Sequence, residues 1–289
     1  MLSIKIFETV FTIDENFWSG KELNVRITGK LFRYIQETKN TYIEVYVKGL
    51  SDSDQLMRLI FLIDAINRLG QKNIYIYMPY LPYARQDHPG KSGEPLSLRI
   101  IGNLFSSVEY AKLIVTDIHS HHAQSFFSDK IKNIPLSFKI EQDPTLFFAL
   151  KNQQYDVVLA PDEGAKARAK SVADLLNIKV LNCLKTRNDT TGEPLLILPK
   201  GIDSLPQNAK ILVVDDICDG GRTFYNLAQL LTQAQGSSSQ DRIKVGKLGL
   251  LITHGIFSHG ITELKKFYSD IYCIYNYSDV SENDIFTSC

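Results

Sequence analysis

The sequence has no excess of either charge. Its 289 residues contain 32 Lys and Arg against 32 Asp and Glu, so the formal net charge at pH 7 is zero. A protein that binds nucleic acid through its phosphates carries a basic excess, so we expect no nucleic-acid partner. With 44% hydrophobic and 22% charged residues, the composition is that of a folded globular protein rather than a disordered chain.

Long apolar runs and a cysteine framework are also missing. The longest apolar stretch, residues 248–257, is far shorter than the roughly 20 residues that a helix needs to cross a bilayer. The N-terminus lacks the basic region, apolar core and cleavage site of a signal peptide. The cysteines form no CxxC pair, so we expect free thiols. We therefore expect a soluble, cytoplasmic protein with no membrane partner. The four cysteines are Cys183, Cys218, Cys273 and Cys289.

Strand-like and helix-like segments alternate along most of the chain, which is typical of parallel sheets covered by helices. The length favours two domains, and we place their boundary after residue 138, near the end of the turn-rich segment 126–139. The domains are then residues 1–138 and 139–289. The predicted strands are 42–47, 73–78, 112–116, 157–160, 178–183, 209–214 and 247–253, and the predicted helices are 52–69, 96–108, 165–176 and 223–233.

One segment of the first half resembles a segment of the second. LIVTDIHSHHAQSF (113–126) is similar to ILVVDDICDGGRTF (211–224), and a second pair is similar to a lesser degree. An internal duplication of an α/β unit would explain both pairs, although any two strand–loop–helix units share such features. Two polar segments, 185–193 and 236–241, contain almost no apolar residue, so we expect loops there, the first of them mobile.

The segment ILVVDDICDGGRTF carries the strongest local signal for a binding site. An apolar strand ends in two carboxylates, and a turn with two glycines then opens a helix. In doubly wound folds, ligands bind past the carboxyl ends of the strands, and free N–H groups at a helix start hold phosphate. Carboxylates accept hydrogen bonds from vicinal hydroxyls, so the segment fits a sugar phosphate; the alternative is an acidic turn with a helix cap. The candidate residues are Asp215, Asp216, Asp219, Gly220, Gly221, Arg222 and Thr223.

This segment resembles the motif of the type I phosphoribosyltransferase fold that binds 5-phosphoribosyl 1-diphosphate (PRPP). MPYLPYARQDHPGKSGEPLS (78–97) and VTDIHSHHAQSFF (115–127) resemble the signature region of ribose-phosphate pyrophosphokinases, or PRPP synthetases. APDEGAKARAKSVAD (160–174) is similar to the family's pyrophosphate loop, and LKTR (184–187) to its catalytic flexible loop. The resemblance implies an α/β protein with two similar domains, each a mostly parallel sheet flanked by helices.

The resemblance also implies an activity: transfer of the diphosphoryl group of Mg-ATP to the anomeric hydroxyl of ribose 5-phosphate, which gives PRPP and AMP. ATP and ribose 5-phosphate are then the substrates, and Mg²⁺ is the cofactor. The first domain would bind ATP, and the second would bind ribose 5-phosphate. A guanidinium suits the triphosphate, because it is always charged and binds in a bidentate manner. By resemblance, the ATP-binding residues are Arg85, Gln86, Asp87, His119, Trp18 and Glu22.

The remaining matches concern the metal, the pyrophosphate and catalysis. By resemblance, Lys185 and Arg187 are the catalytic cations, which would stabilise the charge that develops on the transferred group and on departing AMP. Mg²⁺ prefers oxygen ligands and keeps waters, so a histidine in its site would act through water or on a phosphate. The pyrophosphate-loop residues are Asp162, Glu163, Gly164 and Ala165, and the metal-site residues are Asp117, His119 and Asp162.

The N-terminal segment WSGKEL (18–23) is similar to an element that, in the family, reaches the active site of a neighbouring subunit. The resemblance places Trp18 next to the adenine and implies that Glu22 recognises this base. It also implies self-association into at least a dimer. The alternative is that Trp18 is a core residue. Two residues depart from the family pattern: Arg222 adds a cation beside the 5-phosphate, and Glu163 adds a negative charge to the pyrophosphate loop.

Two other functions stay open at this point. A phosphoribosyltransferase would consume PRPP rather than make it, but such an enzyme needs only one domain of this type and no ARQD motif. A regulatory subunit would bind active subunits without catalysis of its own. The presence of Lys185, Arg187 and the acidic pair opposes the regulatory alternative.

Overall fold

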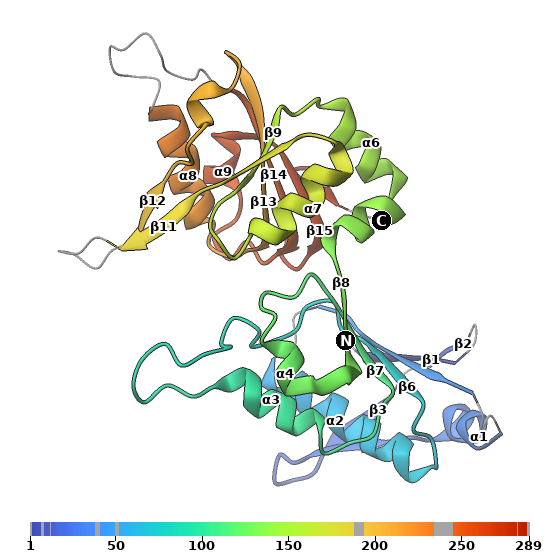
Figure 1. The fold of residues 1–289 in the computed structure, drawn as a ribbon. Helices are drawn as coiled ribbons and strands as arrows, with labels where there is room; N and C mark the ends of the chain where they lie inside the picture. The colour runs from blue at the N-terminus through green and yellow to red at the C-terminus, as the bar shows by residue number, and fades with distance from the viewer. Residues whose placement is uncertain are drawn as a thin grey trace. The chain divides into compact units, whose positions relative to one another are not determined.

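The chain folds as two α/β units, which the computed structural model places at residues 1–134 and 135–289. Each unit contains one six-stranded sheet with helices packed on it (Figure 1). The predicted fold class, two mostly parallel sheets flanked by helices, is confirmed. The structure describes residues 2–6, 9–11, 13–37, 41–49, 52–187, 194–233, 245–281 and 283–287.

The sheet of the first unit is antiparallel at one edge and parallel elsewhere. Its strands are β1 (Leu2–Ile6), β2 (Thr9–Phe11), β5 (Ile43–Val47), β6 (Ile74–Tyr77), β7 (Lys112–Thr116) and β8 (Ile131–Ile134), and its helices are α1 (Gly29–Glu37), α2 (Ser53–Arg68), α3 (Ser97–Phe105) and α4 (Ala123–Phe127). The strand order is β2-β1-β5-β6-β7-β8. β1 pairs antiparallel with β2 and β5, and the other pairs are parallel.

The core of the first unit lies on one face of this sheet. Buried and half-buried residues alternate along β5 and β6, which is the pattern of strands covered on one side. The buried residues of all four helices join a single cluster with the buried strand residues, and Figure 1 shows α2, α3 and α4 on the same side of the sheet. On the other face, the rings of Tyr46 and Tyr77 stack with 4.7 Å between centroids, and both hydroxyls donate to Glu44 at 3.1 Å.

The sheet of the second unit is parallel throughout. Its strands are β9 (Val157–Ala160), β10 (Lys179–Asn182), β13 (Ala209–Cys218), β14 (Val245–Gly255), β15 (Tyr268–Asn276) and β16 (Phe286–Thr287), and its helices are α5 (Leu136–Gln142), α6 (Pro144–Asn152), α7 (Lys166–Leu176), α8 (Arg222–Gln233) and α9 (Thr262–Lys265). The strand order is β10-β9-β13-β14-β15-β16. All four residues of β9 are buried, because α5, α6 and α7 cover one face of the sheet and α8 and α9 the other (Figure 1).

Two antiparallel hairpins stand outside the sheets. β3 (Asp14–Phe17) pairs with β4 (Leu23–Arg26), and β11 (Leu184–Arg187) pairs with β12 (Pro194–Ile197). The prediction of a loop from residue 185 is wrong for its first three residues, because their backbone pairs with β12. The rest of that predicted loop, and the predicted loop 236–241, lie outside the described residues.

Each helix and strand that sequence periodicity predicted matches an observed element within a few residues, but many elements were not predicted, among them α1, α6, β15 and the segment between the units. The predicted helix 52–69 is α2, whose N-terminus is capped by the Asp52 carboxylate accepting from the Gln55 N–H at 2.8 Å. The segment predicted as turn-rich, 126–139, contains β8 and the start of α5 instead. The apolar side chains of Leu136 and Ile140 on α5 pack into the core of the second unit, which therefore begins at Pro135.

The described cysteines, Cys183, Cys218 and Cys273, are buried and form no disulfide with one another, as predicted for free thiols. Burial raises the pKa of the Cys183 and Cys273 thiols to about 12. Cys289 lies outside the described residues. Within the part of the chain that the structure describes, no helix combines the length and apolar content that crossing a membrane requires.

Candidate functional site

The acidic pair of the second unit is held by a buried arginine. β13 continues through Asp215 and Asp216 to Cys218, so the prediction that the strand ends before the pair is wrong. Arg168, on α7, places its Nη1 3.4 Å from Asp215 Oδ1 and 3.8 Å from Asp216 Oδ1. The side chains of Arg168 and Asp216 are only 7% and 5% exposed. The pair is therefore a preformed, partly neutralised group, in which Asp216 is buried and Asp215 half-buried.

Burial determines the protonation behaviour of this pair. Removal from water and the neighbouring Asp216 carboxylate raise the pKa of Asp215 well above its ordinary value, and the Arg168 guanidinium opposes that rise. Sequence reasoning missed Arg168. The signal that could have found it is helical periodicity, since Arg168 lies three residues after Ala165 and four before Val172, on the buried face of α7.

The predicted sugar-phosphate turn joins β13 to α8. Gly221 has φ +74°, a conformation that favours glycine, and an added Cβ would lie 3.3 Å from the Leu264 side chain. Asp219 Oδ1 accepts from Ser258 Oγ at 2.7 Å. Arg222 is the exposed first residue of α8, one residue earlier than the predicted helix start at Thr223. The turn therefore leads into a helix start, whose first N–H groups have no acceptor within the helix, the arrangement that binds phosphate.

The predicted pyrophosphate loop follows β9 in the same unit. Asp162 Oδ1 accepts from the Ala165 N–H at 3.2 Å. Glu163, the departure from the family pattern, is exposed, and its Oε1 lies 2.8 Å from Lys166 Nζ. The added negative charge is therefore balanced locally. The Asp162 carboxylate also contributes to the raised pKa of Asp215, so the loop and the acidic pair act on each other electrostatically.

In the first unit, two loops that carry predicted ATP-binding residues meet. Asp87 accepts a hydrogen bond from Ser120, which follows His119, and lies 2.5 Å from His88 Nδ1. Burial alone would raise the pKa of Asp87. The hydrogen bonds from Ser120 and His88 outweigh this effect and hold the pKa below its ordinary value. The two loops therefore form one surface, on which Arg85, Gln86 and His119 are exposed.

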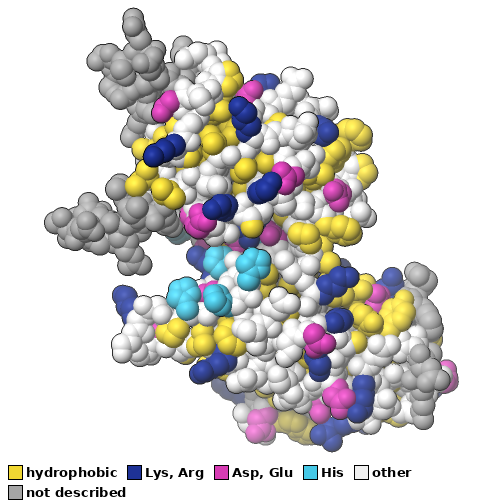
Figure 2. Space-filling view, viewed as in Figure 1, with side chains coloured by type: hydrophobic (Ala, Val, Ile, Leu, Met, Phe, Trp, Pro, Cys, Tyr) yellow, Lys and Arg dark blue, Asp and Glu magenta, His cyan; other side chains and the backbone are white. Residues whose placement is uncertain are grey.

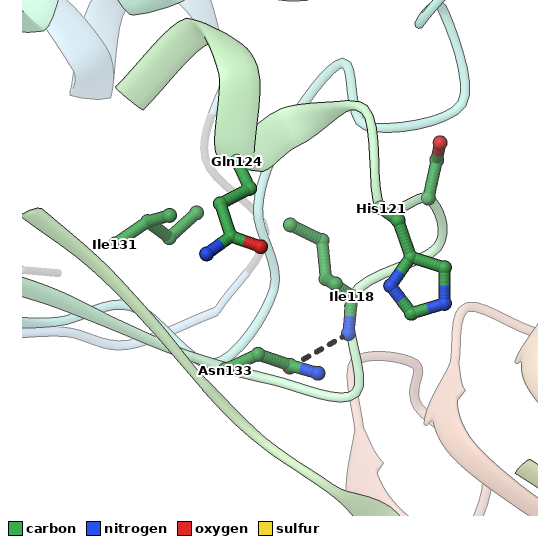
Figure 3. A pocket seen from close by; sticks show the side chains of 6 residues that line it. Ile118, His121, Gln124, Ile131 and Asn133 are labelled. Carbon is green, nitrogen blue, oxygen red and sulfur yellow. Dashed lines mark hydrogen bonds between the residues drawn. The ribbon is translucent and has the colours of Figure 1, made fainter. Parts of the chain in front are cut away.

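A small pocket lies beside this surface. Its volume is about 130 Å³, and its lining residues come from the turn after β7, from α4 and from β8 (Figure 3). The Ile118 N–H donates to Asn133 Oδ1 at 3.0 Å, which ties the turn to β8. Asp117, just before this turn, is buried and has φ +47°. Figure 2 shows histidine side chains gathered in one area of the surface, and four of the six histidines belong to residues 88–122. The pocket is lined by Ile118, Ser120, His121, Gln124, Ile131 and Asn133.

The β3–β4 hairpin presents its predicted adenine-side residues to solvent. The Trp18 N–H donates to the Glu22 carbonyl at 2.9 Å across the turn. Trp18 is 62% exposed, so the alternative that it is a core residue is wrong. The guanidinium of Arg58 lies 5.3 Å from the Phe17 ring centroid, which fixes the hairpin against α2.

The two predicted catalytic cations belong to the β11–β12 hairpin of the second unit. The backbone of Lys185 pairs with Leu196, and that of Arg187 pairs with Pro194. Sequence reasoning placed both residues in a loop because KTRNDTTGE contains almost no apolar residue. A two-stranded hairpin outside a covered sheet needs no apolar alternation, so the pattern that identifies buried strands does not identify this one.

The predicted metal residues fall in both units, with Asp117 and His119 in the first and Asp162 in the second. Among the residues that the structure describes, no group of three or more His, Cys, Asp or Glu side chains could by itself hold a metal ion. Mg²⁺ needs no such cage, since it binds one or two carboxylates together with waters and substrate phosphates. Asp117 in the first unit and Asp162 in the second each offer carboxylate oxygens, the donors that Mg²⁺ prefers, so each residue by its own chemistry fits this ion.

Comparison with known proteins places this architecture in a class. Residues 129–244 match the phosphoribosyl transferase domain, and residues 11–108 match the N-terminal domain of ribose phosphate pyrophosphokinase. A crystal structure of phosphoribosylpyrophosphate synthetase from Mycobacterium smegmatis superimposes with a TM-score of 0.70 at 20% identity, covering 96% of this chain and 85% of that one. The fold is thus that of a two-domain phosphoribosyltransferase-type protein.

Sequence relatives narrow the class to a family. The ribose-phosphate pyrophosphokinase of Pyrococcus furiosus is 31% identical over 235 residues, which are 81% of this chain and 77% of the relative. That of Pyrococcus abyssi is 31% identical over 248 residues, 84% and 80% of the two chains. The chain therefore belongs to the ribose-phosphate pyrophosphokinase family, as the sequence motifs predict.

Proposed function

We propose that the protein is a ribose-phosphate diphosphokinase that converts ribose 5-phosphate and Mg-ATP into PRPP and AMP. Family membership supports this activity, and so does the site of the second unit. The observation that carries the proposal is the acidic pair Asp215 and Asp216, held by Arg168 and followed directly by a glycine turn that opens a helix. Such a combination suits a ligand with vicinal hydroxyls at one end and a phosphate at the other.

Each unit takes one substrate in this proposal. In the second unit, Asp215 and Asp216 accept hydrogen bonds from the ribose hydroxyls, and the turn from Asp219 to Thr223 holds the 5-phosphate. In the first unit, Arg85, Gln86 and Asp87 with His119 bind ATP. The contact between Asp87 and Ser120 supports this grouping, because it joins the two loops that carry these residues. Trp18 and Glu22 contact adenine on a neighbouring subunit, so the working unit is at least a dimer.

The reaction forms one P–O bond and breaks another. The anomeric oxygen of ribose 5-phosphate attacks the β-phosphorus of ATP and loses its proton, and the bond from that phosphorus to the α–β bridging oxygen breaks, so that AMP leaves. Lys185 and Arg187 stabilise the negative charge that gathers on the transferred group and on AMP. Loop amides near Asp162 face the pyrophosphate. Asp117, His119 and Asp162 are the residues that would hold Mg²⁺, which would supply charge neutralisation on the transferred group.

We place the reaction in the cytoplasm. The described cysteines are free thiols, which is the usual state in a reducing compartment. The substrate ATP is a cytoplasmic metabolite, so this location is consistent with the proposed chemistry.

The direct test is an assay of purified protein with ribose 5-phosphate and Mg-ATP, following AMP. We expect AMP to form only when both substrates are present. Asp216→Asn keeps the shape of the side chain but removes its charge, so it should raise the KM for ribose 5-phosphate far more than that for ATP. An equal rise in the KM values for both substrates would show that the acidic pair has a general structural role. Absence of AMP at high enzyme concentration would contradict the proposed activity and favour a regulatory subunit.

A further inference from the structure

A second turn of the second unit lies against the sugar-phosphate turn. β13 and β14 are adjacent parallel strands, with Cys218 opposite Gly255, so the turns that follow them leave the sheet side by side. The N–H groups of Ile256 and Phe257 both donate to the Cys218 carbonyl, at 2.8 and 3.0 Å. Together with the bond from Ser258 to Asp219, these contacts fix one turn against the other.

The His259 side chain packs against the backbone of the sugar-phosphate turn. A Cβ added at Gly220 would lie 3.1 Å from His259 Nδ1 and 3.3 Å from its Cε1. The imidazole thus occupies the space where any larger residue at position 220 would place its side chain. A side chain at position 220, where φ is not in the left-handed region, would therefore have to displace the ring by a few tenths of an ångström. His259 nevertheless remains exposed, so a ligand on the turn can reach its ring.

We propose that His259 is a phosphate-binding side chain of this turn, which acts together with Arg222. The proposal rests on the proposed function for the identity of the ligand, the 5-phosphate of ribose 5-phosphate, although inorganic phosphate shares the relevant chemistry. A phosphate held by the N–H groups that follow Gly220 lies within hydrogen-bond reach, about 3 Å, of a donor packed on that glycine. Imidazole offers such a donor in both of its protonation states.

Packing alone does not account for the imidazole. The turn is already held by the Ser258 hydroxyl on Asp219 and by the Leu264 side chain against Gly221. An exposed, polar ring on Gly220 adds little to that support, since exposed contacts bury little apolar surface. Its position is instead that of a group directed at whatever the turn binds.

Calorimetric titration with ribose 5-phosphate, ribose and inorganic phosphate tests this proposal without relying on turnover. His259→Ala should weaken the binding of ribose 5-phosphate and of inorganic phosphate about tenfold each, the effect of one charge-assisted hydrogen bond. His259→Gln retains a donor of similar reach and should lie between His259→Ala and the native protein. The matched control is Lys170→Ala, which removes an exposed cation of α7 that pairs with Asp174.

The outcomes separate this proposal from the proposed function. Native affinity for ribose 5-phosphate in His259→Ala would overturn it. Loss of ribose 5-phosphate affinity with unchanged phosphate affinity would also overturn it, because His259 would then only position the turn. If both affinities fall in His259→Ala but the native protein forms no AMP, the phosphate site stands and the proposed activity fails. Equal loss in Lys170→Ala would show that the effect is one of net charge, again overturning the proposal.

Discussion

Helices cover the two sheets of the protein differently. In the first unit the helices pack on one face only, and the strands IEVYV and IYIY alternate between buried and half-buried residues. In the second unit both faces are covered, and β9 is buried throughout. A carboxylate pair within a doubly covered sheet loses its water and needs an internal cation, which Arg168 provides. In the first unit Arg85, Gln86 and His119 instead lie exposed on loops, where no such compensation is needed.

We expect the largest effect on stability from a substitution of Arg168, which tests this difference between the units. Arg168→Met should destabilise the protein by about 3 kcal/mol, because it leaves two buried carboxylates without their cation. The exposed pair Arg68–Asp64 of the first unit serves as the control, with side chains 78% and 47% exposed. Arg68→Met should change the stability by less than about 1 kcal/mol. Urea unfolding of both variants measures the difference, and equal losses would show that the acidic pair does not depend on its arginine.

The two hairpins offer the next comparison. Lys185→Ala in the second unit should lower kcat by about 10² to 10³, because in the proposed reaction this cation acts on charge that develops in the transition state. Trp18→Ala in the first unit should mainly raise the KM for ATP, since an adenine contact acts on substrate binding. Steady-state kinetics separate the two results. An unchanged kcat in Lys185→Ala would mean that β11 carries no catalytic group.

Arg222 tests how much the phosphate turn gains from a side chain. Arg222→Gly should raise the KM for ribose 5-phosphate about tenfold and leave the KM for ATP alone. Inhibition by inorganic phosphate should be competitive with ribose 5-phosphate and weaker in the variant. If neither quantity changes, Arg222 points into solvent, and backbone groups alone hold the phosphate.

The smallest effect concerns the uncovered face of the first sheet. Burial and, to a lesser extent, the Glu44 carboxylate raise the pKa of Tyr46 and Tyr77 to about 12. Between pH 10, where tyrosine in an unfolded chain ionises, and pH 12 the folded state holds protons that the unfolded state has lost. Stability therefore falls as the pH rises through this window. The double variant Tyr46→Phe and Tyr77→Phe should lose stability less steeply there.

Thermal unfolding between pH 9 and 12 measures that slope. Tyr225→Phe, which removes a hydroxyl from α8 of the second unit, is the control and should follow the native protein. A slope in the double variant that equals the native one would show that the two tyrosines do not hold their protons in the folded state.

The same contrast explains what sequence reasoning could find. Strands buried on both faces read as continuous apolar runs, so 157–160 was predicted with the observed bounds. The edge strands β2 and β8 of the first unit and the hairpin strands β3 and β11 are too short or too polar to show a pattern. The acidic pair and the glycine turn were found because ligand-binding groups follow a buried strand at short spacing. Arg168 and His259 were missed because they belong to neighbouring elements, which only the folded sheet brings to the turn.

The central claim is that the second unit presents the anomeric oxygen of ribose 5-phosphate to a diphosphoryl donor. The most direct measurement follows ATP labelled at both the β- and γ-phosphorus during the reaction with ribose 5-phosphate. We expect one AMP for each sugar consumed, with both labelled phosphates in the diphosphate group on carbon 1 of the product. Formation of ADP with a single transferred phosphate, or no labelled sugar at any enzyme concentration, would contradict it.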